Sequence, residues 1–232
     1  MLLLHGIMGE SHFTWVRPGI VQALRAAGRR VLLLDARGHG RSQKPHDTAA
    51  YEHDAMARDC QALLDHLELT TVDVVGYSMG AYTGARLVLR DPRPRSLVLG
   101  GAGPITFKRS LALTGAIADA LEADDPSSID DPEVLAWREH ADAAGVDRLA
   151  IAALFRAPRV GDEEELARIA VPAIVLTGEQ DEVAGSGAEL AAAIPTATAV
   201  IVPGSHFPKA DRALDQPAFI GAVLEFLAAR SL

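Results

Sequence analysis

Short apolar runs alternate along the first hundred residues with stretches whose apolar positions recur every three or four residues. The runs predict buried strands at Leu2–Leu4, Val31–Leu34, Val72–Val75 and Leu97–Leu99. The intervening periodic stretches predict helices over Val16–Ala27, Glu52–Leu67 and Ala81–Arg90. Largely apolar strands that alternate with helices are typical of a parallel sheet covered on both faces. The pattern therefore predicts an α/β fold with a mostly parallel sheet.

The alternation is interrupted between Pro104 and Ile169, where only helical spacing remains. We expect helices there over Phe107–Leu121, Glu133–Ala143, Arg148–Phe155 and Glu163–Ile169. The earlier pattern then resumes, with strands predicted at Ala173–Leu176 and Ala199–Val202 and helices at Ser186–Ile194 and Pro217–Ala229. An all-helical insertion in an α/β pattern predicts a helical cap, residues 104–169, on a core formed by residues 1–103 and 170–232.

The pentapeptide Gly76-Tyr77-Ser78-Met79-Gly80 joins a predicted strand to a predicted helix. Two glycines permit a turn in which the backbone passes very close to neighbouring chain, and the serine stands at its apex. The helix that starts behind Ser78 presents N–H groups without intrahelical partners. This arrangement is typical of a nucleophile elbow.

Polar residues follow several predicted strands, and parallel strands place such residues at one edge of the sheet. Ser78, Asp181 and His206 emerge there in that order. A neutral serine needs a base within hydrogen-bond reach, a role for His206, and Asp181 would orient the imidazole. Met79 and Ile7 are predicted to donate N–H groups to an oxyanion hole. Competing residues are Ser42 and Ser186 as nucleophile, Glu179 and Glu182 as acid, and His39 as base.

Five motifs together resemble the α/β-hydrolases that carry a helical cap, a group that includes esterases, lactonases, haloperoxidases and C–C bond hydrolases. They are His5-Gly6, Asp35-x-Arg37-Gly38-His39-Gly40-x-Ser42, the pentapeptide around Ser78, Gly178-x-x-Asp181 and Gly204-x-His206. The resemblance implies that Ser78, Asp181 and His206 are catalytic and that Ile7 and Met79 form the oxyanion hole. The segment after Asp35 looks most like that of 3-oxoadipate enol-lactonases. Candidate substrate-binding residues are Phe13, Trp15, Tyr77, Trp137 and Phe155.

We therefore expect a serine hydrolase that cleaves a small ester or lactone through an acyl-enzyme, with no cofactor and no metal. One alternative keeps the site but transfers the acyl group to peroxide or hydrolyses a C–C bond. Another is a ligand-binding protein without activity on the same scaffold. A dehalogenase is disfavoured because those relatives resemble this fold with an aspartate at the elbow.

The composition limits which partners the protein is expected to bind and where in the cell it is expected to occur. The 232 residues carry a formal net charge of -9, which argues against nucleic acid and anionic membranes as partners. A single cysteine, Cys60, and no apparent signal peptide favour the cytoplasm. The family usually has two further strands before His5-Gly6, so we expect Val31–Leu34 to lie at a sheet edge, open to pairing in a homodimer.

Overall fold

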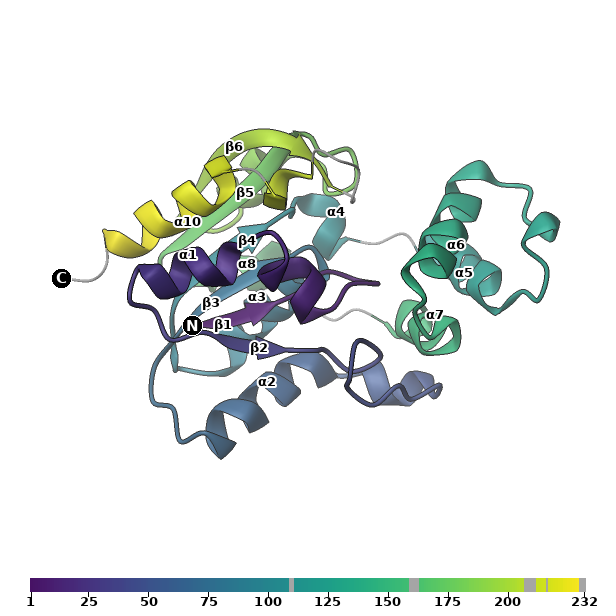
Figure 1. Cartoon of the computed structure of the whole chain (residues 1–232), viewed down its shortest axis with the longest axis horizontal. Coiled ribbons are helices and arrows are strands. Elements are labelled where there is room, and N and C mark those ends of the chain that lie inside the picture. Colours follow the sequence, from purple (N-terminus) through teal and green to yellow (C-terminus); the bar gives the residue numbers. More distant parts are fainter. Residues whose placement is uncertain (109–110, 159–162, 207–211, 216, 230–232) are drawn as a thin grey trace.

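The protein is organised around one parallel sheet. The computed structural model describes residues 1–108, 111–158, 163–206, 212–215 and 217–229. All five strand pairings are parallel, and the strands lie in the order β2 (Leu32–Leu34), β1 (Leu2–Leu4), β3 (Val72–Tyr77), β4 (Pro94–Gly100), β5 (Ala173–Gln180) and β6 (Ala197–Ser205) (Figure 1). The predicted α/β architecture is therefore confirmed.

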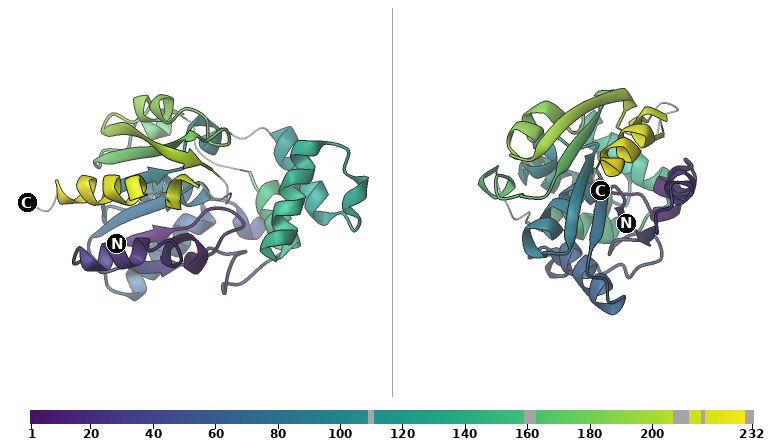
Figure 2. Two further views of the ribbon diagram at one scale, coloured as in Figure 1. Left: turned by 45° about the horizontal axis from the view of Figure 1, so that its top comes forward. Right: turned by 90° about the vertical axis from the view of Figure 1, so that its left-hand side faces the viewer.

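Helices cover both faces of the sheet because alternate side chains of each strand point to opposite faces. Leu2 and Leu4 join one core cluster with α2 (Ala55–His66), α3 (Met79–Arg90) and α9 (Gly187–Ala192). Leu3 joins a second cluster with α1 (Ile20–Ala26) and α10 (Pro217–Ala228). Figure 2 shows these two helical layers on either side of the twisted sheet. The sheet is thus buried on both sides, as its apolar strands predict.

The first helix begins later than its pattern suggests. Of the expected helix over Val16–Ala27 only α1 forms, and Val16 is instead the last residue of a π-helical turn, η1 (His12–Val16). Gly19 separates them because it adopts a left-handed conformation, with φ of 85°. Periodicity alone could not locate this break, since apolar spacing continues across it.

The insertion between β4 and β5 contains only helices in its described part. They are α4 (Pro104–Phe107), α5 (Leu111–Glu122), the short 3-10 turn η3 (Pro126–Ser128), α6 (Pro132–Ala144), α7 (Arg148–Arg156) and α8 (Glu163–Leu166). The predicted helix over Phe107–Leu121 is instead two helices, and residues 109–110 lie outside the described residues. Figures 1 and 2 show α5, α6 and α7 grouped away from the sheet, beyond the ends of its strands.

Strand β2 lies at one edge of the sheet, as expected for Val31–Leu34. Leu33 is 38% exposed there, so part of its apolar surface faces solvent. Pairing of this edge with a second copy of the chain stays a prediction. None of the helices in the described ranges combines the length and apolar character needed to cross a bilayer.

Candidate active site

Ser78 occupies a strained turn between β3 and α3. Its φ of 53° and ψ of -113° lie in a region that non-glycine residues rarely adopt. Two close approaches explain the flanking glycines. A Cβ on Gly76 would lie 2.2 Å from the carbonyl oxygen of Gly80, and a Cβ on Gly80 would lie 2.0 Å from that of Leu4. The Ser78 N–H donates to the Gly100 carbonyl at 2.8 Å, which ties the turn to β4.

Replacement of Gly80 by alanine should destabilise the fold strongly. The added methyl group would overlap the backbone of β1, which cannot move without disturbing the sheet. We expect a loss of roughly 3 kcal/mol or more in the free energy of unfolding, measured by urea denaturation. A matched control is Gly115→Ala in α5, where an added Cβ meets nothing within 4 Å. It should stabilise the protein by about 0.5–1 kcal/mol, and equal effects of the two substitutions would contradict the argument.

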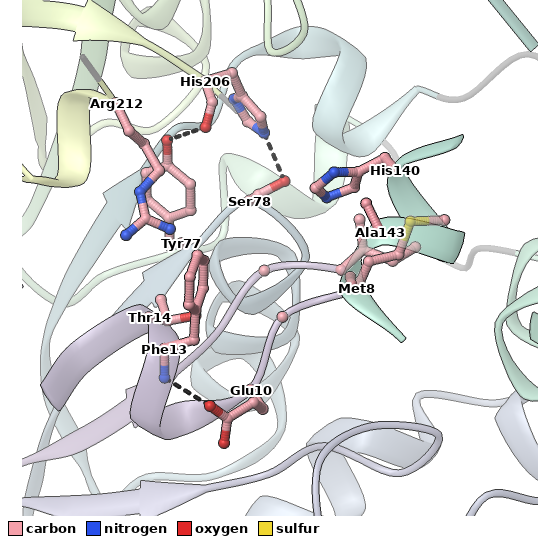
Figure 3. A pocket seen from close by; sticks show the side chains of 14 residues that line it. Met8, Glu10, Phe13, Thr14, Tyr77, Ser78, His140, Ala143, His206 and Arg212 are labelled. Carbon is pink, nitrogen blue, oxygen red and sulfur yellow. Dashed lines mark hydrogen bonds between the residues drawn. The ribbon is translucent and has the colours of Figure 1, made fainter. Parts of the chain in front are cut away.

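Three side chains form a continuous hydrogen-bonded chain at the carboxyl ends of the strands. His206 Nε2 lies 3.0 Å from Ser78 Oγ (Figure 3), and His206 Nδ1 lies 2.8 Å from Asp181 Oδ2. Because a carboxylate only accepts, Nδ1 carries a proton and Nε2 is left to accept one from the serine. His206 and Asp181 are 5% and 9% exposed. The structure therefore brings together the three residues that the sequence singles out.

The imidazole and the carboxylate are each held by further contacts. Asp181 follows β5, and its Oδ1 accepts hydrogen bonds from the N–H groups of Val183 and Ala184 at 3.1 and 2.9 Å. The hydroxyl of Tyr77 donates to the backbone carbonyl of His206 at 2.9 Å, and the two rings lie 5.4 Å apart. The two bonds to Oδ1 leave Asp181 Oδ2 facing the imidazole, and the Tyr77 bond holds the backbone of His206.

The loop after β1 lies directly beside the serine. A Cβ on Gly6 would be 3.5 Å from the Cβ of Ser78, and Ile7 lines the same cavity as the serine hydroxyl. Met79 is the first residue of α3, so its N–H has no partner within the helix. Ile7 and Met79 belong to one apolar cluster. Their placement is that expected of two oxyanion donors.

Two buried histidines brace this loop and remain neutral. His5 Nδ1 donates to the Gly6 carbonyl at 2.8 Å, while its Nε2 accepts from the Ala36 N–H at 3.0 Å. His39 donates from Nδ1 to the Arg37 carbonyl at 3.0 Å, and its ring meets that of His5 edge to face. Burial lowers the pKa of both, that of His39 to about 3. These contacts indicate that His39 has a structural role.

Protein stability should fall as the pH drops from 6.5 to 5. An unfolded imidazole binds a proton near pH 6.5, whereas the pKa of His39 in the fold is about 3. The unfolded chain therefore binds more protons in this range, and stability declines by about 1.4 kcal/mol per pH unit below about pH 5.5. Urea unfolding of the wild type and of His39→Gln, measured across this range, should show a shallower slope in the variant. Parallel slopes would contradict a neutral buried His39.

A cavity of about 530 Å³ opens onto the serine. Its lining comes from the loop after β1, from η1, from the serine turn, from one face of α6 and from two residues that follow β6: Gly6, Ile7, Met8, Gly9, Glu10, Phe13, Thr14, Tyr77, Ser78, His140, Ala143, Ala144, His206 and Arg212. A second cavity of about 420 Å³ shares Ile7 with it and contains Met79 and Phe155. Within the described residues, no group of three His, Cys, Asp or Glu side chains could hold a metal ion.

The aromatic residues expected to bind substrate have different positions. Phe13 and Tyr77 line the first cavity, and Phe155 lines the second. Trp137 lines neither cavity and packs edge to face on Phe155, with ring centroids 5.6 Å apart. Trp15 is fully buried in the core beneath α1, so the structure gives no support to its expected substrate contact. Sequence could not show which of these aromatic side chains face a cavity, because that depends on how the elements pack together.

The competing candidates lie elsewhere or have other partners. The hydroxyl of Ser42 donates to the Asp35 carbonyl at 2.6 Å, and Ser186 caps the amino end of α9. Glu179 and Glu182 are exposed.

His140 and Arg212 also line the first cavity, although the sequence does not indicate either as a site residue. His140 has no motif around it, and only the position of α6 reveals its relation to Ser78.

The fold and this arrangement of residues define the class of α/β hydrolases. A family model described as the alpha/beta hydrolase fold matches residues 1–139. The chain therefore belongs to the alpha/beta hydrolase family.

Individual relatives agree with this assignment. The chain is 38% identical over 94 residues to an sn-1-specific diacylglycerol lipase of Xenopus laevis, a match that covers 40% of this chain but 28% of the lipase. A solved structure of a hydrolase from Pseudomonas aeruginosa PA01 is 31% identical, with a TM-score of 0.72 and coverage of 97% and 88% of the two chains. The enol-lactonase from Burkholderia xenovorans LB400 is 27% identical, with a TM-score of 0.69 and coverage of 98% and 90%.

Proposed function

We propose that this protein is a serine hydrolase that cleaves a small carboxylic ester or lactone. The observation that carries the proposal is the hydrogen-bonded chain from Ser78 through His206 to Asp181, with distances of 3.0 and 2.8 Å. The strained conformation of Ser78 supports it, because backbone strain in such a turn is characteristic of a nucleophile elbow. The lipase and enol-lactonase relatives act on bonds of this type, as their names state.

In the proposed reaction, Ser78 Oγ attacks the carbonyl carbon while His206 Nε2 takes the serine proton. The N–H groups of Ile7 and Met79 stabilise the oxyanion of the tetrahedral intermediate. His206 then returns the proton to the departing alkoxide, which leaves an acyl-enzyme on Ser78. Water attacks this ester with His206 again as the base, and the carboxylic acid is released. For a lactone the product is one hydroxy acid.

The position of helices α5–α7 favours a small substrate. Residues of α6 form one wall of the cavity that contains Ser78, so the proposed cap restricts access from that side. A volume of about 530 Å³ is within the usual range for a site that binds a small organic molecule. The proposed ligand is thus a small organic ester or lactone.

A fluorophosphonate probe tests the proposal without any choice of substrate. The probe should form one adduct on the wild-type protein, and mass spectrometry should locate it at Ser78. Labelling should disappear in His206→Ala, because the serine then has no base. A folded wild-type protein that stays unlabelled, or that is labelled at Ser42 or Ser186, would reject the proposed nucleophile.

A further inference from the structure

The inserted helices place one imidazole beside the proposed nucleophile. Three residues of α6, His140, Ala143 and Ala144, line the serine cavity, and their spacing of three and four places them on one face of the helix. Figure 3 shows the His140 ring beside the Ser78 hydroxyl, on a different side from His206. His140 is the one side chain of these three with hydrogen-bonding atoms.

Helix α6, which carries His140, is fastened at several points. The buried guanidinium of Arg138 donates to the Ala120 and Ala123 carbonyls at 2.8 and 2.7 Å, which fastens α6 to the end of α5. Asp131 caps the amino end of α6 by accepting from the Glu133 N–H at 2.9 Å. A helix that is already fixed in place loses little conformational freedom when one of its side chains binds a ligand.

The surroundings of His140 favour the uncharged imidazole. It is half-buried, and burial lowers its pKa below the ordinary value of 6.5. At neutral pH the ring therefore has one protonated nitrogen, which can donate, and one unprotonated nitrogen, which can accept. Such a ring suits hydroxyl and oxo groups, which exchange hydrogen bonds without bringing a charge. The charged side chains of the cavity, Glu10 and Arg212, both contact Phe13: Glu10 accepts from the Phe13 N–H at 2.7 Å, and the Arg212 guanidinium lies 5.1 Å from the centre of the Phe13 ring.

The geometry of the proposed reaction places the His140 ring beside the acyl part of the substrate. The departing alkoxide must lie near His206 Nε2 to receive its proton, so the acyl chain extends away from His206. The neighbouring walls formed by Ile7, Met8 and Ala143 are apolar. A polar group next to apolar walls orients a ligand and discriminates between otherwise similar acyl chains.

We propose that His140 determines specificity by exchanging a hydrogen bond with a hydroxyl or oxo group on the acyl chain. Esters and lactones of hydroxy or oxo acids are then preferred over their unsubstituted counterparts. This inference rests on the proposed function and specifies its substrate class.

A set of ethyl esters tests the inference by pH-stat titration: those of butanoic, 2-hydroxybutanoic, 3-hydroxybutanoic and 3-oxobutanoic acid. The wild type should prefer at least one substituted ester over the butanoate by tenfold or more in kcat/KM. His140→Ala should reduce that ratio at least tenfold, and His140→Gln should retain part of it because its amide still forms hydrogen bonds. His66→Ala, which removes an exposed imidazole at the end of α2, should leave the ratio unchanged.

Two results would overturn the inference: a wild type that prefers none of the substituted esters, or a His140→Ala protein with the wild-type ratio. Fluorophosphonate labelling of Ser78 separates this failure from failure of the proposed function. A protein that is labelled at Ser78 but shows no such preference is still a serine hydrolase, whereas an unlabelled protein rejects both ideas.

Discussion

Ser78→Ala should reduce ester turnover by at least about a thousandfold and leave the fold intact. The hydroxyl is the proposed attacking group, and its oxygen lies 3.0 Å from His206 Nε2, the proposed base. Loss of a serine nucleophile in enzymes of this type costs on the order of 10³- to 10⁶-fold, with residual rate supplied by the oxyanion donors and by binding. Initial rates on a chromogenic short-chain ester, with far-ultraviolet circular dichroism as the folding check, measure the effect.

Ser186→Ala is the matched control. Its hydroxyl accepts a hydrogen bond from the Glu189 N–H at 3.3 Å as the cap of α9, away from the serine cavity. Loss of this cap should lower the free energy of unfolding by about 1 kcal/mol and leave the kinetic constants unchanged. If Ser78→Ala kept wild-type turnover while folded, the assignment of the nucleophile would be wrong.

The sheet and the three central residues could be predicted because strong local signals determine both. Apolar strands between helices admit few topologies, and parallel strands bring Ser78, Asp181 and His206 to one edge. The two glycines of the serine turn have a steric reason that the motif encodes, because a Cβ on Gly76 or Gly80 would lie 2.2 or 2.0 Å from a backbone carbonyl oxygen. Local sequence patterns and the rules of sheet assembly together are therefore enough to predict the sheet and the positions of these three residues.

The wall of the cavity opposite the sheet could not be predicted in the same way. Its residues come from an insertion whose helices are recognisable, but whose orientation on the core depends on long-range packing among many apolar contacts. His140 therefore looked like an ordinary helical histidine, although α6 places it beside Ser78. Trp15 illustrates the converse, because its position soon after the Ile7 loop suggested the cavity, yet it packs into the core.

Asp181→Asn should lower kcat by roughly 10⁴-fold with little effect on KM. The backbone N–H groups of Val183 and Ala184 bind Oδ1, so in the variant they would hold the amide oxygen in that place. The amide NH₂ would then face His206 Nδ1, where the carboxylate now accepts. Nδ1 would have to become the acceptor and Nε2 would carry the proton, so the imidazole could no longer take the proton of Ser78. Steady-state kinetics on the same ester measure the loss.

The neighbouring acids provide the comparison for this substitution. Glu179→Gln and Glu182→Gln remove one negative charge each from exposed positions two residues before and one residue after Asp181. Both should keep kcat within about twofold, since surface charges act weakly through water and salt. A large loss in either glutamine variant, with Asp181→Asn nearly as active as the wild type, would transfer the role of the acid to that glutamate. All three variants remove one negative charge, but only Asp181→Asn changes the tautomer of His206. A large loss of kcat in that variant alone would therefore show that the tautomer, and not the local charge, controls the rate.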